Sequence, residues 1–239
     1  MKFEDRVRHA VVHYWRTLQQ QETRQKNGKR DTGNRAAVTG GKQMDGFADL
    51  IESTVIENIN DGIRLFKNKL LVLPGYFRPT KEWDLLIFHK KTLLAAIELK
   101  SQRGPSFGNN YNNRSEEIVG LGHDVQIAYR EQAFGHGAPR PWFGSLMLLE
   151  DCPESQRPTH MQEPHFPVFP EFKDSSYAKR YEVTFRRLRT ENLFSETALI
   201  LAVESGATTG EHREPAEDLS VKRFVASLVG HIAGIVAAE

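Results

Sequence analysis

The chain carries two kinds of hydrophobic pattern, one typical of helices and the other typical of strands. Apolar residues recur at helical spacing in five segments, residues 3–26, 44–60, 115–134, 177–193 and 220–238. Short apolar runs predict strands in five others, residues 70–77, 83–88, 92–100, 141–150 and 198–203. The order helix, helix, three strands, helix, strand, helix, strand, helix predicts an α/β fold with a central mixed sheet flanked by helices.

The connecting segments are polar and rich in turn-forming residues. A mobile loop is expected to end near Gly41, and a Gly/Asn-rich loop to run from Gly104 to Asn113. Residues 150–176 contain five prolines, so only turns are expected there. The length of 239 residues suits one domain over residues 1–239. We expect a core over about 44–203, with residues 1–43 and 218–238 as additions.

Composition points to a soluble cytosolic protein. Apolar residues make up 39% and charged residues 26% of the chain, and no stretch approaches the roughly 20 apolar residues of a membrane span. The N-terminus lacks the apolar core of a secretory signal, and the single cysteine, Cys152, excludes a disulfide framework. The net charge of +1 argues weakly against a dedicated nucleic-acid coat. Two segments, residues 16–35 and 179–189, are locally basic. Each is either a solvated helix face or a candidate set of phosphate contacts.

The segment WDLLIFHKKTLLAAIELKSQ carries the strongest chemical signal. Asp84 begins one predicted strand, Glu98 lies near the end of the next, and Lys100 follows two positions later. Side chains two apart on a strand share a face, and an antiparallel partner strand would bring Asp84 beside them. Because the surrounding run is apolar, a carboxylate and an amine there are costly unless they are paired or bind an ion. An isolated E-x-K is far more often an ordinary pair on an edge strand.

Two carboxylates with an open face suit Mg²⁺, which prefers oxygen ligands and keeps several waters. Asp84 and Glu98 are therefore candidate metal ligands. The ion would polarise a phosphate and lower the pKa of an attacking water. Lys100 would orient or deprotonate that water, or stabilise the charge that develops at phosphorus.

These residues resemble the PD-(D/E)XK nuclease superfamily, although Trp83 replaces the usual proline before the Asp. Two flanking segments, RAAVTGGKQMDGF at 35–47 and SFGNNYNNRSEE at 106–117, resemble the XhoI family of type II restriction endonucleases. The resemblance extends from about residue 5 to about residue 203. It implies a PD-(D/E)XK restriction-endonuclease-like core in a bacterial, cytoplasmic, Mg²⁺-dependent homodimer. Such an enzyme would cut double-stranded DNA at CTCGAG or a close relative, with a cognate DNA methyltransferase protecting the host.

Further candidates lie around this set. Many nucleases of the superfamily add a helix carboxylate, for which Glu52 is slightly favoured over Asp49 and Glu57; a solvent-facing acid is about as plausible. Asparagine can read adenine and arginine can read guanine, whereas Asn and Gly also simply form turns. The predicted DNA contacts are Asn109, Asn110, Asn112, Asn113, Arg114, Lys42, Gln43 and Arg186.

Two other functions compete with a sequence-specific endonuclease. A repair or junction-resolving nuclease of the same fold would cut by DNA structure, and a DNA-binding module would use the fold without catalysis. The complete set of Asp84, Glu98 and Lys100 argues against the second alternative, and the flanking segments argue against the first.

Overall fold

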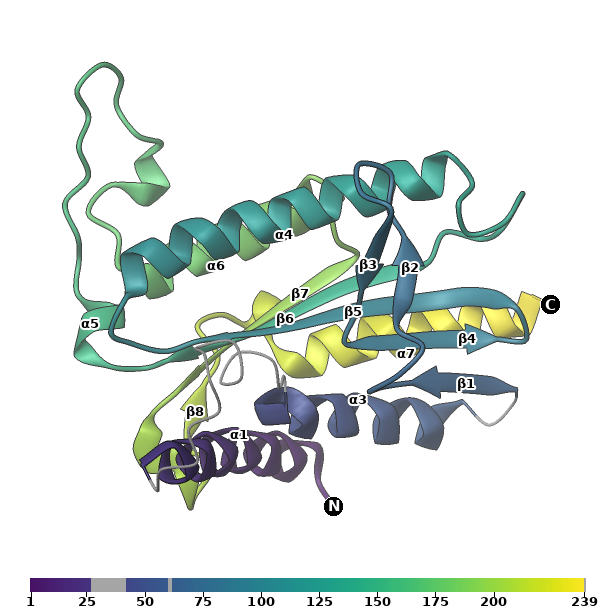
Figure 1. Ribbon diagram of the computed structural model, residues 1–239, viewed down its shortest axis with the longest axis horizontal. Coiled ribbons are helices and arrows are strands. Elements are labelled where there is room, and N and C mark those ends of the chain that lie inside the picture. Colours follow the sequence, from purple (N-terminus) through teal and green to yellow (C-terminus); the bar gives the residue numbers. More distant parts are fainter. Residues whose placement is uncertain (27–41, 60–61, 239) are drawn as a thin grey trace.

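A computed structural model describes residues 1–26, 42–59 and 62–238 of the chain (Figure 1). At its centre is a six-stranded sheet in the order β1-β4-β5-β6-β7-β8. Its strands are β1 (Ile63–Phe66), β4 (Leu85–His89), β5 (Thr92–Gln102), β6 (Trp142–Glu150), β7 (Glu196–Ala202) and β8 (His212–Arg213). Strands β1, β4 and β5 pair antiparallel, β5, β6 and β7 pair in parallel, and β8 is antiparallel to β7. The predicted α/β fold with a central mixed sheet is confirmed.

Helices cover both faces of this sheet (Figure 1). One face packs against α1 (Phe3–Lys26), α3 (Asp45–Asn58) and α7 (Val221–Ala238), and the other against α4 (Phe107–Arg130) and α6 (Tyr177–Thr190). Along β5 the two faces alternate: Ile97 and Leu99 belong to the first core, and Ala96 belongs to the second. Glu98 and Lys100 therefore point toward the α4 and α6 side, because residues two apart share a face.

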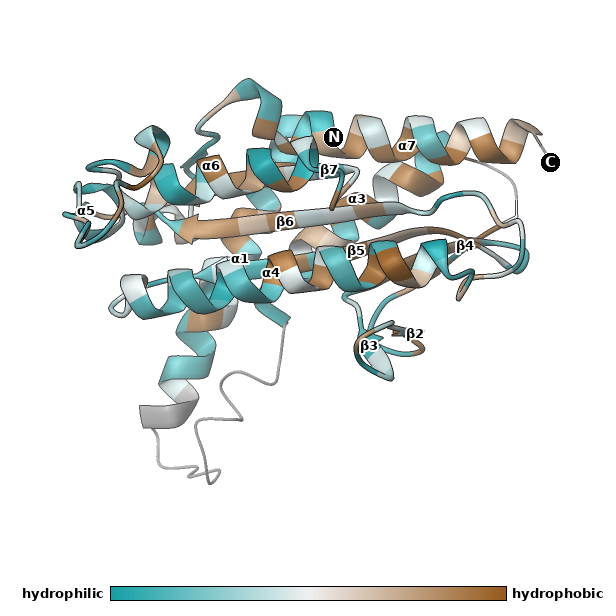
Figure 2. Cartoon of the chain, turned by 90° about the horizontal axis from the view of Figure 1, so that it is seen from above, coloured by the Kyte–Doolittle hydropathy of each residue, from teal (hydrophilic) through white to brown (hydrophobic). Residues whose placement is uncertain are grey.

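The central strands are apolar because both of their faces are covered. In Figure 2, β6 lies in the middle with much of its length in brown, whereas the helices beside it carry polar residues as well. The first eight residues of β6 are all buried. A charged or hydroxyl side chain at the centre of this sheet is consequently an exception that calls for a reason.

A small hairpin, separate from the central sheet, is made of β2 (Val72–Pro74) and β3 (Thr80–Glu82) (Figure 2). Its turn is attached to α4 through Asp124, which is only 4% exposed. Asp124 accepts hydrogen bonds from the backbone N–H groups of Tyr76 and Phe77, at 2.8 and 2.7 Å, and from Nε of Arg78 at 2.8 Å. This carboxylate fixes the turn and directs Arg78 toward the sheet.

The structure corrects two sequence-based predictions near the motif. The strand predicted at 70–77 is wrong in its bounds and its place, because the strand covers only Val72–Pro74 and lies in the hairpin; β1 is the third strand of the antiparallel meander. The loop predicted from Gly104 to Asn113 is also wrong, since α4 begins at Phe107. The Phe107 ring is buried, and the Tyr111 hydroxyl lies 3.0 Å from that of Thr184 on α6. These contacts outweigh the low helix propensity of glycine and asparagine.

Short elements complete the described chain. They are η1 (Lys42–Met44), α5 (Pro153–Gln156), η2 (Pro170–Phe172), η3 (Glu204–Ala207) and η4 (Glu217–Leu219). The proline-rich segment contains two of them, α5 and η2, each a single turn. The predicted loop that ends near Gly41 lies outside the described residues.

Helix α7 bears on the expectation that no segment could span a membrane. By length and composition alone α7 meets that criterion, so the expectation is wrong as stated. One face of α7 is nevertheless buried in the core, through Val221, Phe224, Leu228 and Ile232. A single helix of this kind is weak evidence for a membrane span, because core helices of soluble proteins pass the same test.

Candidate active site

Strands β4 and β5 bring Asp84 and Glu98 to neighbouring positions. Leu85 pairs with Ile97 in the antiparallel register, and the N–H of Asp84 donates to the carbonyl of Ile97 at 3.2 Å. Oδ2 of Asp84 accepts a hydrogen bond from the N–H of Leu99 at 2.7 Å. The hairpin geometry expected from the sequence therefore places the Asp84 carboxylate directly beside the Glu98–Lys100 segment.

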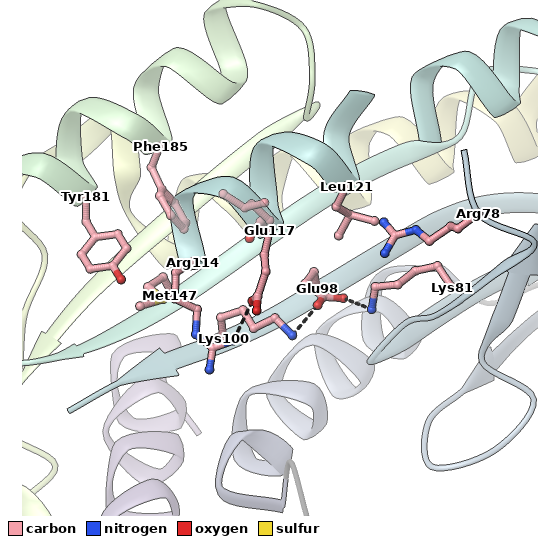
Figure 3. A pocket seen from close by; sticks show the side chains of 12 residues that line it. Arg78, Lys81, Glu98, Lys100, Arg114, Glu117, Leu121, Met147, Tyr181 and Phe185 are labelled. Carbon is pink, nitrogen blue, oxygen red and sulfur yellow. Dashed lines mark hydrogen bonds and ion pairs between the residues drawn. The ribbon is translucent and has the colours of Figure 1, made fainter. Parts of the chain in front are cut away.

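Glu98 is almost completely buried and is held by two lysines (Figure 3). Nζ of Lys100 lies 2.6 Å from Oε1, and Nζ of Lys81 lies 2.9 Å from Oε2. Lys100 belongs to the same strand, whereas Lys81 comes from β3 of the separate hairpin. Both carboxylate oxygens thus have a cationic partner, which is what a buried charge requires.

The Asp84 carboxyl is buried and lies close to the Glu98 carboxylate. Burial raises the pKa of Asp84 to about 6, and the nearby Glu98 carboxylate adds to the rise, although the Leu99 N–H and the two lysines oppose it. Burial alone would lower the pKa of Lys100, but its contacts with Glu98 outweigh this effect and raise that pKa. Two crowded carboxylates under a low-dielectric cover are stabilised by a positive charge between them. The residues present therefore fit a divalent metal ion.

A cavity of about 380 Å³ opens beside Glu98, and Asp84 is not among its lining residues. Its lining comes from β5, β6, the hairpin, α4 and α6, and consists of Arg78, Lys81, Glu98, Lys100, Arg114, Glu117, Ile118, Leu121, Ser145, Met147, Tyr181 and Phe185. Arg114 donates to Glu117 at 2.8 Å (Figure 3). Four cationic side chains line the cavity, and two of them pair with Glu98, an arrangement suited to an anionic substrate such as a phosphodiester.

The candidate helix carboxylates lie elsewhere. Asp49 and Glu52 both pair with Lys67, and Glu57 pairs with Arg6 at 2.7 Å. Helix α3, which carries all three, packs on the sheet face opposite to Glu98. The structure does not bring Glu52, the favoured candidate, to the cavity.

The predicted DNA contacts divide into several groups. Arg114 lines the cavity, whereas Asn109, Asn112 and Asn113 are exposed and Asn110 is half-buried on the first turns of α4. Residues 109, 112 and 113 share one face of that helix because of their spacing.

Other predicted contacts lie away from the cavity. Lys42 and Gln43 form part of η1, before α3. Arg186 makes two hydrogen bonds to Asp218, both 2.9 Å long, and a further one to Glu182. Arg186 is therefore engaged within the protein, and its contact with DNA stays a prediction.

Five polar residues of the lining were missed from the sequence: Arg78, Lys81, Glu117, Ser145 and Tyr181. Lys81 and Arg78 belong to a hairpin without a hydrophobic alternation, so no local pattern linked them to the motif. Ser145 was hidden inside an apolar strand, although one hydroxyl in such a run was a usable signal. Among the residues the structure describes, no group of three His, Cys, Asp or Glu side chains could enclose a metal. An ion held by Asp84 and Glu98 would therefore keep positions for water and substrate.

Comparison with known proteins gives a consistent result. Residues 23–214 match the family described as restriction endonuclease XhoI. The type II restriction enzyme BstVI of Geobacillus stearothermophilus is 50% identical over 215 residues, 88% of this chain and 95% of that enzyme. The type II restriction enzyme XhoI of Xanthomonas vasicola is 42% identical over 227 residues, 90% of this chain and 88% of that enzyme. No solved structure matches the chain.

The fold and these matches define the class: the chain is a type II restriction endonuclease, a site-specific deoxyribonuclease acting on double-stranded DNA. Within this class it belongs to the XhoI family, whose match spans the sheet, the hairpin and the whole cavity.

Proposed function

We propose that this enzyme hydrolyses phosphodiester bonds of double-stranded DNA with Mg²⁺ held by Asp84 and Glu98. The observation that supports this most directly is the buried Glu98 carboxylate, which faces a cationic cavity and lies beside a second carboxylate. When bound, the metal would polarise the scissile phosphate and lower the pKa of a water. Glu52 is left out of the proposed ligands because it pairs with Lys67 on the opposite side of the sheet.

The cationic residues of the cavity have different proposed tasks. Lys100, next to Glu98, orients the attacking water or stabilises charge at phosphorus. Arg78 and Arg114 hold phosphate oxygens, because guanidinium groups bind phosphate in a fixed geometry. The exposed row of Asn109, Asn112 and Asn113 on α4 is proposed to contact the duplex outside the cavity. Base reading by asparagine would occur in the major groove.

The relationship to the XhoI family supports a more specific proposal. The recognition site is CTCGAG or a close relative, cut by a cytoplasmic bacterial homodimer that leaves 5′-phosphate ends. A palindromic site matches the two-fold symmetry of such a dimer. A cognate DNA methyltransferase protects the same site in the host.

The test is digestion of a mapped plasmid by the purified protein with Mg²⁺. Discrete fragments that end at CTCGAG are expected, and a smear or uncut DNA would refute the proposal. Glu98→Gln and Lys100→Ala should each lower the cleavage rate by more than about 100-fold, since each removes a group that acts on the transition state. Glu52→Gln and the exposed Lys91→Ala are the matched controls, and both should cut normally.

A further inference from the structure

Ser145 lies on β6, directly opposite Glu98 in the parallel register of β5 and β6. Its side chain is fully buried and lines the cavity beside Glu98, Lys100 and Met147. The strand around it, Trp142 to Leu149, otherwise consists of apolar residues and one glycine. A hydroxyl therefore occurs at the one position of this strand segment that faces the Glu98 carboxylate.

The Ser145 hydroxyl has no hydrogen-bond partner among the described residues. A buried donor without an acceptor destabilises a folded protein, so alanine would fit the position better if packing alone mattered. The acceptor nearest in the register is the Glu98 carboxylate, but both of its oxygens already pair with Lys81 and Lys100. Each carboxylate oxygen can accept a second hydrogen bond, but the Glu98 carboxylate, as its two lysines hold it, accepts none from Ser145.

Metal binding would change how the Glu98 carboxylate is held and bring one of its oxygens within reach of the Ser145 hydroxyl. A cation that takes one oxygen of Glu98 cannot share it with the lysine that held it, so the arrangement of donors around the carboxylate must change. Carboxylates that ligate metals are commonly oriented by a further hydrogen bond from a neighbouring residue. Paired residues on adjacent strands have side chains on the same face and within reach of each other.

We propose that Ser145 is a positioning residue that donates a hydrogen bond to the Glu98 carboxylate when a divalent metal ion is bound. This inference rests on the proposed metal site. It predicts that removal of the hydroxyl has two opposite effects. The stability of the metal-free protein stays the same or rises, because a donor without a partner is removed, whereas the affinity for the metal ion falls. A purely structural serine would not couple these two properties.

The experiment compares Ser145→Ala with Ser115→Ala, whose hydroxyl on α4 is also buried and partnerless among the described residues but does not line the cavity. Urea unfolding is measured without divalent ions, Ca²⁺ binding is measured by calorimetry, and the Mg²⁺ dependence of plasmid cleavage is followed. Both variants should unfold at the same or higher urea concentration than wild type. Only Ser145→Ala should raise the half-saturating Ca²⁺ and Mg²⁺ concentrations, by about tenfold or more. Ser145→Thr keeps the hydroxyl, so its half-saturating Ca²⁺ and Mg²⁺ concentrations should be close to those of wild type.

Two outcomes would overturn the inference alone. One is a metal dependence of Ser145→Ala within about twofold of wild type, too small for a lost orienting contact. The other is a clear loss of metal-free stability in Ser145→Ala but not in Ser115→Ala, which would show that the hydroxyl already has a partner. Glu98→Gln separates these results from a failure of the metal site itself. If Glu98→Gln binds Ca²⁺ as wild type does, the proposed function and this inference both fall.

Discussion

The Glu98 side chain is 2% exposed, and its charge is balanced by lysines from two different elements. Lys100 is fixed two positions away on β5, whereas Lys81 reaches the carboxylate from the hairpin. The cavity therefore contains a cation pair where the proposed metal would bind. In the metal-free enzyme these lysines neutralise the charge of the buried carboxylate, which lowers the free-energy cost of burying it.

Substitution of Lys81 by Met tests this compensation. The variant should lose about 1–3 kcal/mol of metal-free stability, because a buried carboxylate oxygen loses its charged donor. Added Ca²⁺ should then stabilise the variant more than it stabilises wild type, since the ion restores the missing charge. Urea unfolding with and without Ca²⁺ measures both effects. The exposed Lys69→Met serves as control, and equal responses in the two variants would contradict the idea.

The candidate site could be predicted from the sequence only where its residues are close along the chain. Asp84, Glu98 and Lys100 lie within one predicted hairpin, so period-two alternation was enough to place them on one face. Lys81 and Ser145 reach Glu98 through the folding of β3 and the parallel pairing of β6, which no local pattern encodes. Glu52 could not be placed for a related reason, because helical spacing does not show which sheet face a helix covers.

At the scale of elements, the β2–β3 hairpin positions part of the candidate active site from outside the central sheet. It contributes Arg78 and Lys81 to the cavity, and its turn is attached to α4 by Asp124. Burial alone would raise the pKa of Asp124, but hydrogen bonds from Arg78, Phe77 and Tyr76 outweigh it and lower that pKa. The charged carboxylate is thus the form that holds the turn.

Asp124→Ala should therefore loosen the hairpin. We expect a loss of about 2–3 kcal/mol in the free energy of unfolding, because two backbone donors and one guanidinium lose a shared acceptor. DNA affinity in Ca²⁺ should fall and its salt dependence should weaken, as Arg78 is no longer held in the cavity. Arg78→Met removes one donor and leaves the two backbone bonds, so its stability loss should be smaller. Equal losses in the two variants would show that the backbone bonds do not hold the turn.

Long elements could be predicted better than short ones. Strand β5 and helices α1, α6 and α7 have enough residues for their periodicity to be visible. Strand β1 has four residues, β3 is polar, and β8 has two, so these strands exist because of their partners. The start of α4 was missed because asparagine and glycine favour turns locally, whereas Phe107 and Tyr111 pack against the tertiary structure.

At the scale of the whole molecule, a network of ion pairs joins α6, β7, η4 and α7. Arg186 and Arg189 of α6 both bind Asp218, and Arg189 also binds Glu196 on β7 at 2.8 Å. Arg223 on α7 lies 3.1 Å from the same glutamate. The basic segment that includes Arg186 and Arg189, expected as a solvated face or a DNA contact, here connects elements across the fold.

This network makes the stability of the fold depend on pH in the acidic range. The hydrogen bond from Arg186 lowers the pKa of Asp218 to about 2; burial opposes the shift, and Arg189 adds to it. A carboxyl whose pKa is lowered by folding stabilises the protein above its unfolded pKa of about 4, and this contribution is lost as the pH falls toward about 2. Asp218→Asn should cost roughly 1–2 kcal/mol at pH 7.

The cost of Asp218→Asn should shrink steadily as the pH falls from about 4 toward about 2, because wild-type Asp218 then becomes neutral as well. Urea unfolding of both proteins across this range measures the gap between them, with the exposed Asp174→Asn as control. A gap that stays constant down to the lowest pH would mean that the charge on Asp218 does not stabilise the fold. Because the network lies away from the cavity, the DNA cleavage rate of folded Asp218→Asn at pH 7 should match that of wild type. This network would then contribute to stability without contributing to catalysis.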